Sequence, residues 1–89
     1  MDLADVTGQP NRGGKPVKSN EKIFKRLGAN LRSARQTAEL SQQKLAEKAG
    51  VNRVTVSGIE RGTENPSLIM LLKLANELNI PIENLLRGV

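Results

Sequence analysis

The chain has 89 residues, of which 14 are lysine or arginine and 9 are aspartate or glutamate, so its formal net charge is +5. A chain of this length forms one small domain, and its positive charge suits a partner that carries phosphate groups. It contains no cysteine and no histidine, which excludes disulfides, thiol nucleophiles, histidine acid–base catalysis and metal sites built from these residues. We therefore expect a protein that is not an enzyme and that uses no metal and no cofactor.

The composition also argues against two kinds of partner. Phe24 is the single aromatic residue, so the chain lacks the rings on which single strands and unpaired RNA bases stack. It has no run of about 18 apolar residues, and its start, MDLADVTGQP, lacks the basic and then apolar pattern of a signal peptide. We expect a cytoplasmic protein with no membrane partner.

Residues 1–20 differ in composition from the rest of the chain. They are rich in glycine, proline and asparagine, carry Arg12, Lys15 and Lys18, and show no apolar period. We expect a flexible basic tail that is disordered in the free protein. A basic arm can wrap a DNA duplex or enter its minor groove. The alternative is a solvated tail with no specific role, which the mild charge of the segment favours.

Residues 21–89 are predicted to fold as one all-α domain with five helices. The first helix is expected from about Glu21 to Ala38, with Asn20 as its cap. Its apolar positions recur at helical spacing and are Ile23, Leu27, Leu31, Ala34 and Ala38.

Two short helices joined by a tight turn are predicted within Ser41–Gly62. Ser41 and Asn52 are good N-cap residues, and Gly50 stands where the first of these helices must stop in a left-handed conformation. The positions predicted to point inward are Leu45, Ala46, Ala49, Val56 and Ile59. The opposite face then carries Arg53, Val54, Ser57, Gly58 and Arg61. Helices this short are not stable alone, so they must pack on neighbours, and the polar face calls for a function.

Two more helices are predicted near the end of the chain. Ser67 caps the fourth, and Asn79 ends it in a left-handed conformation. Its buried stripe is predicted to be Leu68, Leu71, Leu72, Ala75 and Leu78. Pro81, which suits a first helical turn, opens a short fifth helix that runs to about Leu86.

The segments SQQKLA, AGVN, VTVSGIERG and NPSLIMLLKLANELNI resemble the helix-turn-helix of the phage-repressor and Cro-like (Xre-type) regulators. The resemblance covers about Ile23–Leu86. It implies a lambda-repressor-like DNA-binding domain of a prokaryotic or phage protein, associated with the nucleoid. The second and third helices would form the helix-turn-helix, with a recognition helix at about Asn52–Arg61 in the major groove.

A narrower resemblance rests on the small size of the chain and the run VSGIERGTENPSL. Both are similar to the controller proteins of restriction–modification systems, which bind tandem sites, activate at low concentration and repress at high concentration. Many phage and chromosomal regulators share the run, so membership of this subfamily stays open.

The resemblance assigns base contacts to the outward face of the recognition helix. Arg53 stands at a base-contact position, and its forked guanidinium fits O6 and N7 of guanine; a phosphate contact is the alternative. Val54 would pack on a thymine methyl group, or would simply be exposed. Gly58 stands where many relatives carry a long polar side chain. We expect it to allow close approach of the backbone to DNA, or to leave room for Arg53 and Arg61.

Other residues are expected to contact the sugar–phosphate backbone. Gln42 and the backbone amides around it would hold a phosphate, and Lys44 adds charge where relatives often carry a glutamate. Arg35 is expected to form a partly buried ion pair with Glu60 and also to touch a phosphate. The full predicted DNA-binding set is Arg35, Gln42, Gln43, Lys44, Asn52, Arg53, Val54, Thr55, Ser57, Gly58, Arg61 and Asn65.

A homodimer is expected because one such domain binds its operator weakly. Relatives dimerise and so place two recognition helices about 34 Å apart. Several apolar residues remain once the predicted core of the fourth helix is assigned: Ile69, Met70, Ile80, Ile82, Leu85, Leu86 and Val89. We expect them to form the dimer interface; the alternative is that they complete the core of the monomer.

The sequence therefore predicts a sequence-specific, homodimeric transcriptional regulator that binds a pseudo-palindromic site in double-stranded DNA. No small-molecule ligand is expected, and control would come from concentration, from dimerisation or from a second regulatory protein. Two other classes stay open. One is an antitoxin or adaptor that holds a protein partner through its last two helices, and the other is a nucleoid-type DNA binder without sequence preference.

Overall fold

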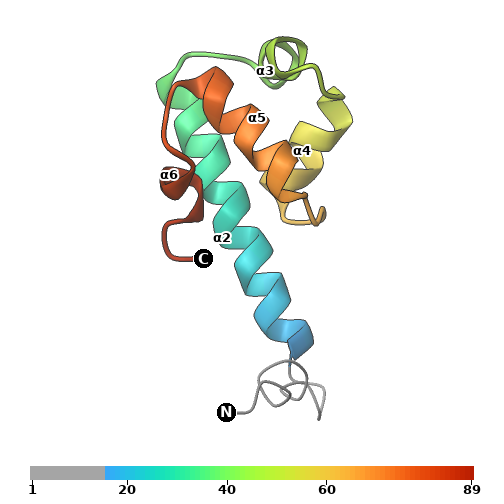
Figure 1. The fold of residues 1–89 in the computed structure, drawn as a ribbon. Coiled ribbons are helices and arrows are strands. Elements are labelled where there is room, and N and C mark those ends of the chain that lie inside the picture. The colour runs from blue at the N-terminus through green and yellow to red at the C-terminus, as the bar shows by residue number, and fades with distance from the viewer. Residues whose placement is uncertain (1–15) are drawn as a thin grey trace.

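The computed structural model describes residues 16–89, with side chains from residue 20 onward. Within this range the chain forms only α-helices and no strand, which confirms the all-α fold. The helices are α2 (Pro16–Thr37), α3 (Gln42–Ala49), α4 (Arg53–Arg61), α5 (Leu68–Leu78) and α6 (Ile82–Leu86). In Figure 1, α2 is a long rod whose second half is surrounded by the other helices, while its first turns project beyond them.

The start of α2 differs from the prediction. The helix begins at Pro16 and not at Glu21, so Asn20 lies inside it and is not its cap. Proline suits a first helical turn because it has no N–H to leave unpaired. No glycine or proline follows before Gly28, so nothing in the sequence interrupts the helix there. The predicted boundary at residue 20 is therefore wrong for the helix, and the first 15 residues of the tail predicted for residues 1–20 lie outside the described residues.

The predicted starts of the short helices are confirmed by hydrogen bonds. The Ser41 hydroxyl accepts from the Lys44 N–H at 3.0 Å, and the Asn52 side-chain oxygen accepts from the Val54 N–H at 2.7 Å. The Ser67 hydroxyl likewise accepts from a backbone N–H of the first turn of α5. The predicted left-handed ends are confirmed as well: the φ angle is 71° at Gly50, and 62° at Asn79.

A single apolar core lies where α2 meets the other helices. Helix α2 packs against α4 and α6, and α3 packs against α4 and α5. The buried core consists of Leu27, Leu31, Leu45, Ala46, Val56, Ile59, Leu71, Leu74, Ala75, Leu78 and Leu85. Most of these positions follow the predicted apolar periods, but Ile23 and Ala38, at the two ends of the stripe predicted for the first helix, are exposed, and α2 ends at Thr37.

The buried face of α5 is not the predicted one. Leu68 and Leu72 were expected inside and are exposed, whereas Leu74 is fully buried. The segment LIMLLKLANEL is apolar on every side over its first two turns, so its periodicity does not select a face. The structure selects the stripe of Leu71, Leu74, Ala75 and Leu78.

Glycine allows α2 and α4 to touch through their backbones. A Cβ atom added at Gly28 would collide with the carbonyl oxygen of Ile59 and would lie 2.6 Å from that of Glu60. Contacts this short are not possible for a real side chain. Gly28 therefore sets how closely α4 lies against α2.

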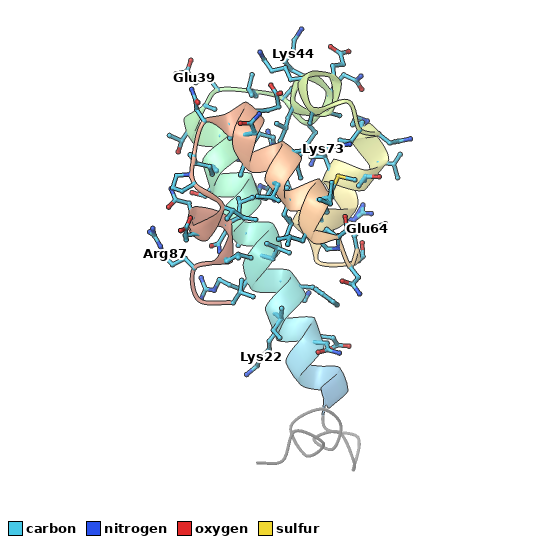
Figure 2. The ribbon with its side chains drawn as sticks, in the orientation of Figure 1. Lys22, Glu39, Lys44, Glu64, Lys73 and Arg87 are labelled. Carbon is cyan, nitrogen blue, oxygen red and sulfur yellow. The ribbon has the colours of Figure 1, made fainter. Side chains whose placement is uncertain are left out.

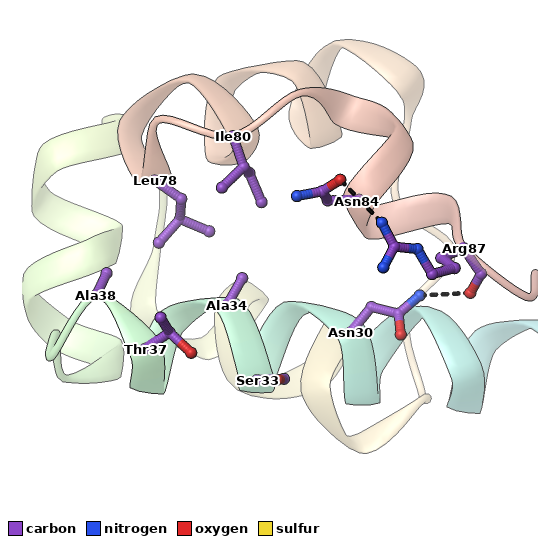
Figure 3. Close-up of a pocket in the computed structure, with 9 residues that line it drawn as sticks. All are labelled: Asn30, Ser33, Ala34, Thr37, Ala38, Leu78, Ile80, Asn84 and Arg87. Carbon is purple, nitrogen blue, oxygen red and sulfur yellow. Dashed lines mark hydrogen bonds between the residues drawn. The ribbon is translucent and has the colours of Figure 1, made fainter.

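A hollow of about 340 Å³ lies between α2 and the segment from the end of α5 to α6 (Figure 3). It is lined by Asn30, Ser33, Ala34, Thr37, Ala38, Leu78, Ile80, Asn84 and Arg87. Asn30 donates from its side-chain nitrogen to the carbonyl oxygens of Leu85 and Arg87, both at 2.8 Å. These bonds fasten the end of the chain to α2. Arg87 is the one ionisable side chain among the described residues that line the hollow. These residues therefore offer no acid–base pair.

Candidate functional site

Helix α4 separates an inner apolar side from an outer polar side. Val56 and Ile59 are buried against the core, while Arg53, Val54 and Arg61 are exposed. The residues of the predicted set that the structure leaves exposed are Gln43, Lys44, Asn52, Arg53, Val54, Arg61 and Asn65. Those that are partly buried are Arg35, Gln42, Thr55 and Ser57. The prediction that this face points into solvent is confirmed for Arg53, Val54 and Arg61, whereas Ser57 is partly buried and Gly58 is buried.

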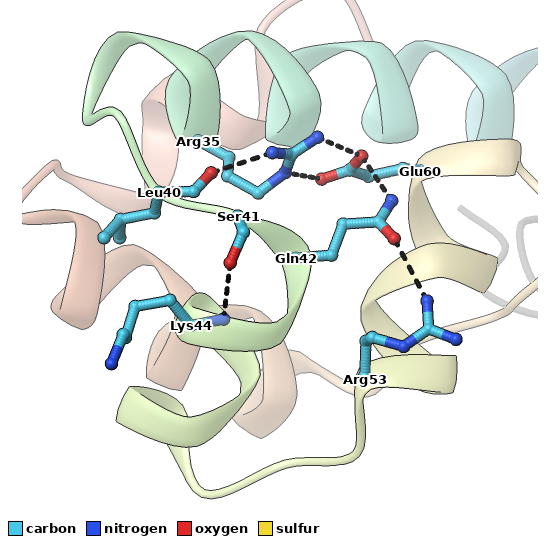
Figure 4. Close-up of polar contacts among 7 residues, drawn as sticks. All are labelled: Arg35, Leu40, Ser41, Gln42, Lys44, Arg53 and Glu60. Atoms are coloured by element: carbon cyan, nitrogen blue, oxygen red, sulfur yellow. Dashed lines mark hydrogen bonds and ion pairs between the residues drawn. The ribbon is translucent and has the colours of Figure 1, made fainter.

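A polar network fastens α2, α3 and α4 together behind this face (Figure 4). Nε and Nη2 of Arg35 donate to the two carboxylate oxygens of Glu60 at 2.7 and 3.0 Å. The third nitrogen, Nη1, donates to the carbonyl oxygen of Leu40 at 2.8 Å. The side chains of Arg35 and Glu60 are 12% and 2% exposed. The predicted ion pair is confirmed, and its hydrogen bonds to Glu60 raise the pKa of Arg35 above its ordinary value.

The same network limits what Arg35 offers to a partner. All three of its nitrogens donate within the protein, to Glu60 and to the loop before α3. These bonds favour a structural role, in which Arg35 fixes the spacing of the helices. A phosphate contact of Arg35 stays a prediction.

Gln42 connects this network to the outer face of α4. Its side-chain nitrogen donates to Glu60 at 3.0 Å, and its side-chain oxygen lies 3.5 Å from Nη1 of Arg53. The second distance is at the upper limit of a hydrogen bond, so Arg53 is only loosely held. Gln42 is thus fixed, while the guanidinium of Arg53 is free to turn outward.

The first turn of α3 carries two exposed polar side chains that are tied to Glu47. Gln43 donates to its carboxylate at 3.0 Å, and Nζ of Lys44 lies 3.6 Å from it. The bond from Gln43, followed by the charge of Lys44, lowers the pKa of Glu47. Exposed contacts within one helix are weak, so both side chains can exchange Glu47 for another anion. The first turn of α3 holds no acidic residue.

The structure at the end of α4 contradicts the prediction made for Gly58. Gly58 is buried, and a Cβ atom there would lie 2.5 Å from Cγ of Glu64. The space above Gly58 was expected to be open to a partner or to neighbouring arginines, but the side chain of Glu64 fills it. The reason is Gly62, whose left-handed φ of 80° turns the chain back across the end of α4. Sequence reasoning missed Glu64, although Gly58 and Gly62 together were a signal for such a return.

The residues predicted to form the dimer interface differ in how deeply they are buried. Ile69, Leu86 and Val89 are exposed, whereas Met70, Ile80 and Ile82 pack partly on the core. Leu85 is fully buried. Its assignment to an interface is wrong, because its side chain completes the monomer core beneath α6. Leu68 and Leu72 of α5 are exposed apolar residues that the prediction left out.

Two further observations concern the part of the chain that the structure describes. No helix there combines the length and the apolar character needed to cross a lipid bilayer. No three acidic, histidine or cysteine side chains in that part come together as metal ligands would.

Comparisons with known proteins agree with this geometry. A family model described as Helix-turn-helix matches residues 31–85. The Control protein C.SmaI of Serratia marcescens is 40% identical over 60 residues, which are 67% of this chain and 71% of that protein. The crystal structure of the restriction-modification controller protein C.AhdI from Aeromonas hydrophila is 42% identical, with a TM-score of 0.68, and the match covers 70% of this chain and 94% of that one.

Other relatives are longer than the matched region. An uncharacterized HTH-type transcriptional regulator of Mycobacterium tuberculosis is 39% identical over 56 residues, which are 63% of this chain. The match spans 40% of the length of that protein.

Proposed function

Because the chain belongs to the Helix-turn-helix family (HTH_3), whose members are transcriptional regulators and not enzymes, we propose that it is a sequence-specific regulator that acts as a homodimer. Its site is a pseudo-palindromic operator in double-stranded DNA. Its place is the cytoplasm of a prokaryote or of a phage-infected cell, in contact with the nucleoid.

The observation that carries the proposal is the division of α4 into two faces. Val56 and Ile59 anchor the helix in the core, and the Arg35–Glu60 pair fixes it against α2. The outer face is therefore presented as a rigid surface. The major groove of B-DNA, about 12 Å wide, admits an α-helix presented in this way.

Bases are read from the first turn of α4. Arg53 is held loosely by Gln42, so its forked guanidinium can turn to O6 and N7 of a guanine. Val54 is exposed one residue later and packs on a thymine methyl group. Asn52, Thr55 and Ser57 stand at the edges of this surface.

Phosphates are held on both sides of the groove. On one side are Gln43, Lys44 and the free amides of the first turn of α3, which attract an anion through the helix dipole. On the other side are Arg61 and Asn65, both exposed. Such contacts fix the register of the protein on DNA and carry no sequence information.

The second copy binds through exposed apolar residues of α5, of α6 and of the segment after α6. These are Leu68, Ile69, Leu72, Leu86 and Val89. Symmetric pairing of this surface buries it and presents two recognition helices to two half-sites. In Leu86→Asp, a carboxylate would have to be buried in the interface, so the mass in solution falls to that of one chain. An unchanged mass would place the interface elsewhere.

Selection from a pool of randomised duplexes tests the proposed function. Wild-type protein should enrich one two-fold symmetric motif, and footprinting on DNA that flanks its own gene should protect that motif. Equal retention of all sequences would identify a nucleoid-type binder and refute the proposal. Control of the proposed regulator would come from its concentration, from dimerisation or from a second regulatory protein.

The exposed leucines of α5 favour one other function. Leu68, Ile69 and Leu72 form an apolar surface that an antitoxin or adaptor would use to hold a different protein. If these residues remain accessible in the homodimer, the surface belongs to such a partner. Protection of their amides from hydrogen exchange on dimerisation would instead assign it to the second copy.

A further inference from the structure

Glu64 lies on the recognition helix although it belongs to the loop that follows it (Figure 2). A Cβ atom at Gly58 would be 2.5 Å from Cγ of Glu64, 3.3 Å from its carboxyl carbon and 3.2 Å from Oε2. The carboxylate therefore rests directly over residue 58 of α4. The turn is held by Thr63, whose N–H and hydroxyl both donate to the carbonyl oxygen of Gly58, at 2.9 and 3.2 Å.

Residue 58 belongs to the outward stripe of α4. It follows Val54 by four residues and precedes Arg61 by three, and residues at these spacings are neighbours on a helix surface. The helix has no side chain of its own there. The chemical group that the protein offers at this point of the stripe is the carboxylate of Glu64.

The surroundings of this carboxylate leave it available to a partner. Glu64 is exposed and has no ion pair with any of the described residues. The charged side chains on the outward face of α4 are Arg53 and Arg61, and Lys25 of α2 lies against Gly62 in the turn that precedes Glu64. An ionised carboxylate only accepts hydrogen bonds, and a phosphate repels it. In the major groove its partners are exocyclic amino groups, N4 of cytosine and N6 of adenine.

We propose that Glu64 is a specificity-determining residue, which accepts a hydrogen bond from a base amino group in the major groove. It takes the place of the side chain that α4 lacks at Gly58. This inference rests on the proposed function, because it requires α4 to lie in the groove.

The test compares motifs selected from randomised duplexes by wild type, by Glu64→Ala and by Glu83→Ala. Glu83 is an exposed glutamate on α6, so its replacement changes the net charge equally. Glu64→Ala should lose the preference for cytosine or adenine at one position of each half-site, with about 5- to 150-fold less discrimination there. Glu83→Ala should select the wild-type motif.

A second variant tests the same proposed base contact without replacing Glu64. Gly58→Ala improves helix propensity, but its methyl group must displace the Glu64 side chain. It should therefore lose the same preference as Glu64→Ala while its melting temperature stays at or above that of wild type. A purely structural role for Glu64 would not produce this combination.

Modified operators identify the base. Replacing the cytosine by 2-pyrimidinone, or the adenine by purine, removes the amino group. The correct replacement should weaken wild type and leave Glu64→Ala unaffected. Tighter binding of Glu64→Ala to all sequences by one common factor would show that Glu64 only repels phosphates, and an unchanged motif would show that it does not reach a base. Either result overturns the inference. Failure of wild type to select any motif would instead overturn the proposed function.

Discussion

The outer faces of α4 and α5 present opposite chemistry on helices of similar size. Each helix buries one apolar stripe in the same core. The outer face of α4 carries arginines, small polar residues and a single exposed valine, Val54, and is fixed from behind by the Arg35–Glu60 pair. The outer face of α5 carries Leu68, Ile69 and Leu72, which remain in contact with water in the monomer. A single domain thus offers one surface suited to a polar partner and another suited to an apolar one.

The largest expected effect is a loss of stability when the ion pair that holds α4 against α2 is broken. Glu60→Ala strands the guanidinium of Arg35 in a site where its side chain is only 12% exposed. Leaving one charge of a buried pair without its partner costs about 3–5 kcal/mol of unfolding free energy. Urea unfolding followed by helical circular dichroism measures this loss. Glu83→Ala, on the exposed surface of α6, is the control, and equal stability of the two variants would contradict the structural role of the pair.

A matched pair of substitutions separates the two faces. Val54 on α4 and Ile69 on α5 are almost equally exposed, at 60% and 62%. Val54→Asp places a carboxylate against DNA and should abolish operator binding while the mass in solution stays that of the dimer. Ile69→Asp should halve the mass and weaken operator binding as a consequence. Sedimentation and duplex titration measure the two properties. The comparison fails if both variants change the same property.

A smaller effect is expected at one base pair. Arg53→Ala removes the forked contact to guanine, which is worth about 1–3 kcal/mol of discrimination per half-site. Titration with operators that differ at single positions should show the preference relaxed at one of them. A uniform loss over all sequences would make Arg53 a phosphate ligand.

The smallest expected effect is a change in the salt dependence of DNA binding when one lysine is removed. Lys44 and Lys73 are exposed lysines on α3 and α5 (Figure 2). If Lys44 neutralises a phosphate, Lys44→Ala should lower the slope of log affinity against log salt by about 1. Lys73→Ala should leave the slope unchanged, because α5 lies outside the proposed DNA-binding surface. Equal changes in slope would mean that both lysines act only through the general field.

The face of α4 could be predicted from the sequence because its pattern has a single solution. Val56 and Ile59 are apolar and three residues apart, and Val54, two residues before Val56, cannot share their face. Asn52 and Gly62 mark the ends of the helix. The helix can be turned in only one way. The ion pair of Arg35 with Glu60 was carried over from the resemblance, and the structure confirms it.

The face of α5 could not be predicted in this way. Leu68, Leu71, Leu72 and Leu74 are chemically alike, so the buried stripe depends on which of them meets α3 and α6. The burial of Leu85 depends on the same tertiary packing. The position of Glu64 over Gly58 depends on the path of a loop, which residue periodicity does not describe.

Gly28 has a consequence for how such a protein changes its target. The distance between α2 and α4 is set at Gly28 by main-chain atoms in direct contact. No side chain lies between the two helices there, so no substitution of such a side chain can change the distance. If α4 reads bases as proposed, exchanges on its outer surface change the preferred DNA sequence while its packing against α2 is preserved. The contact that positions α4 is thus separate from the residues proposed to read bases, so the preferred DNA sequence can change through single substitutions.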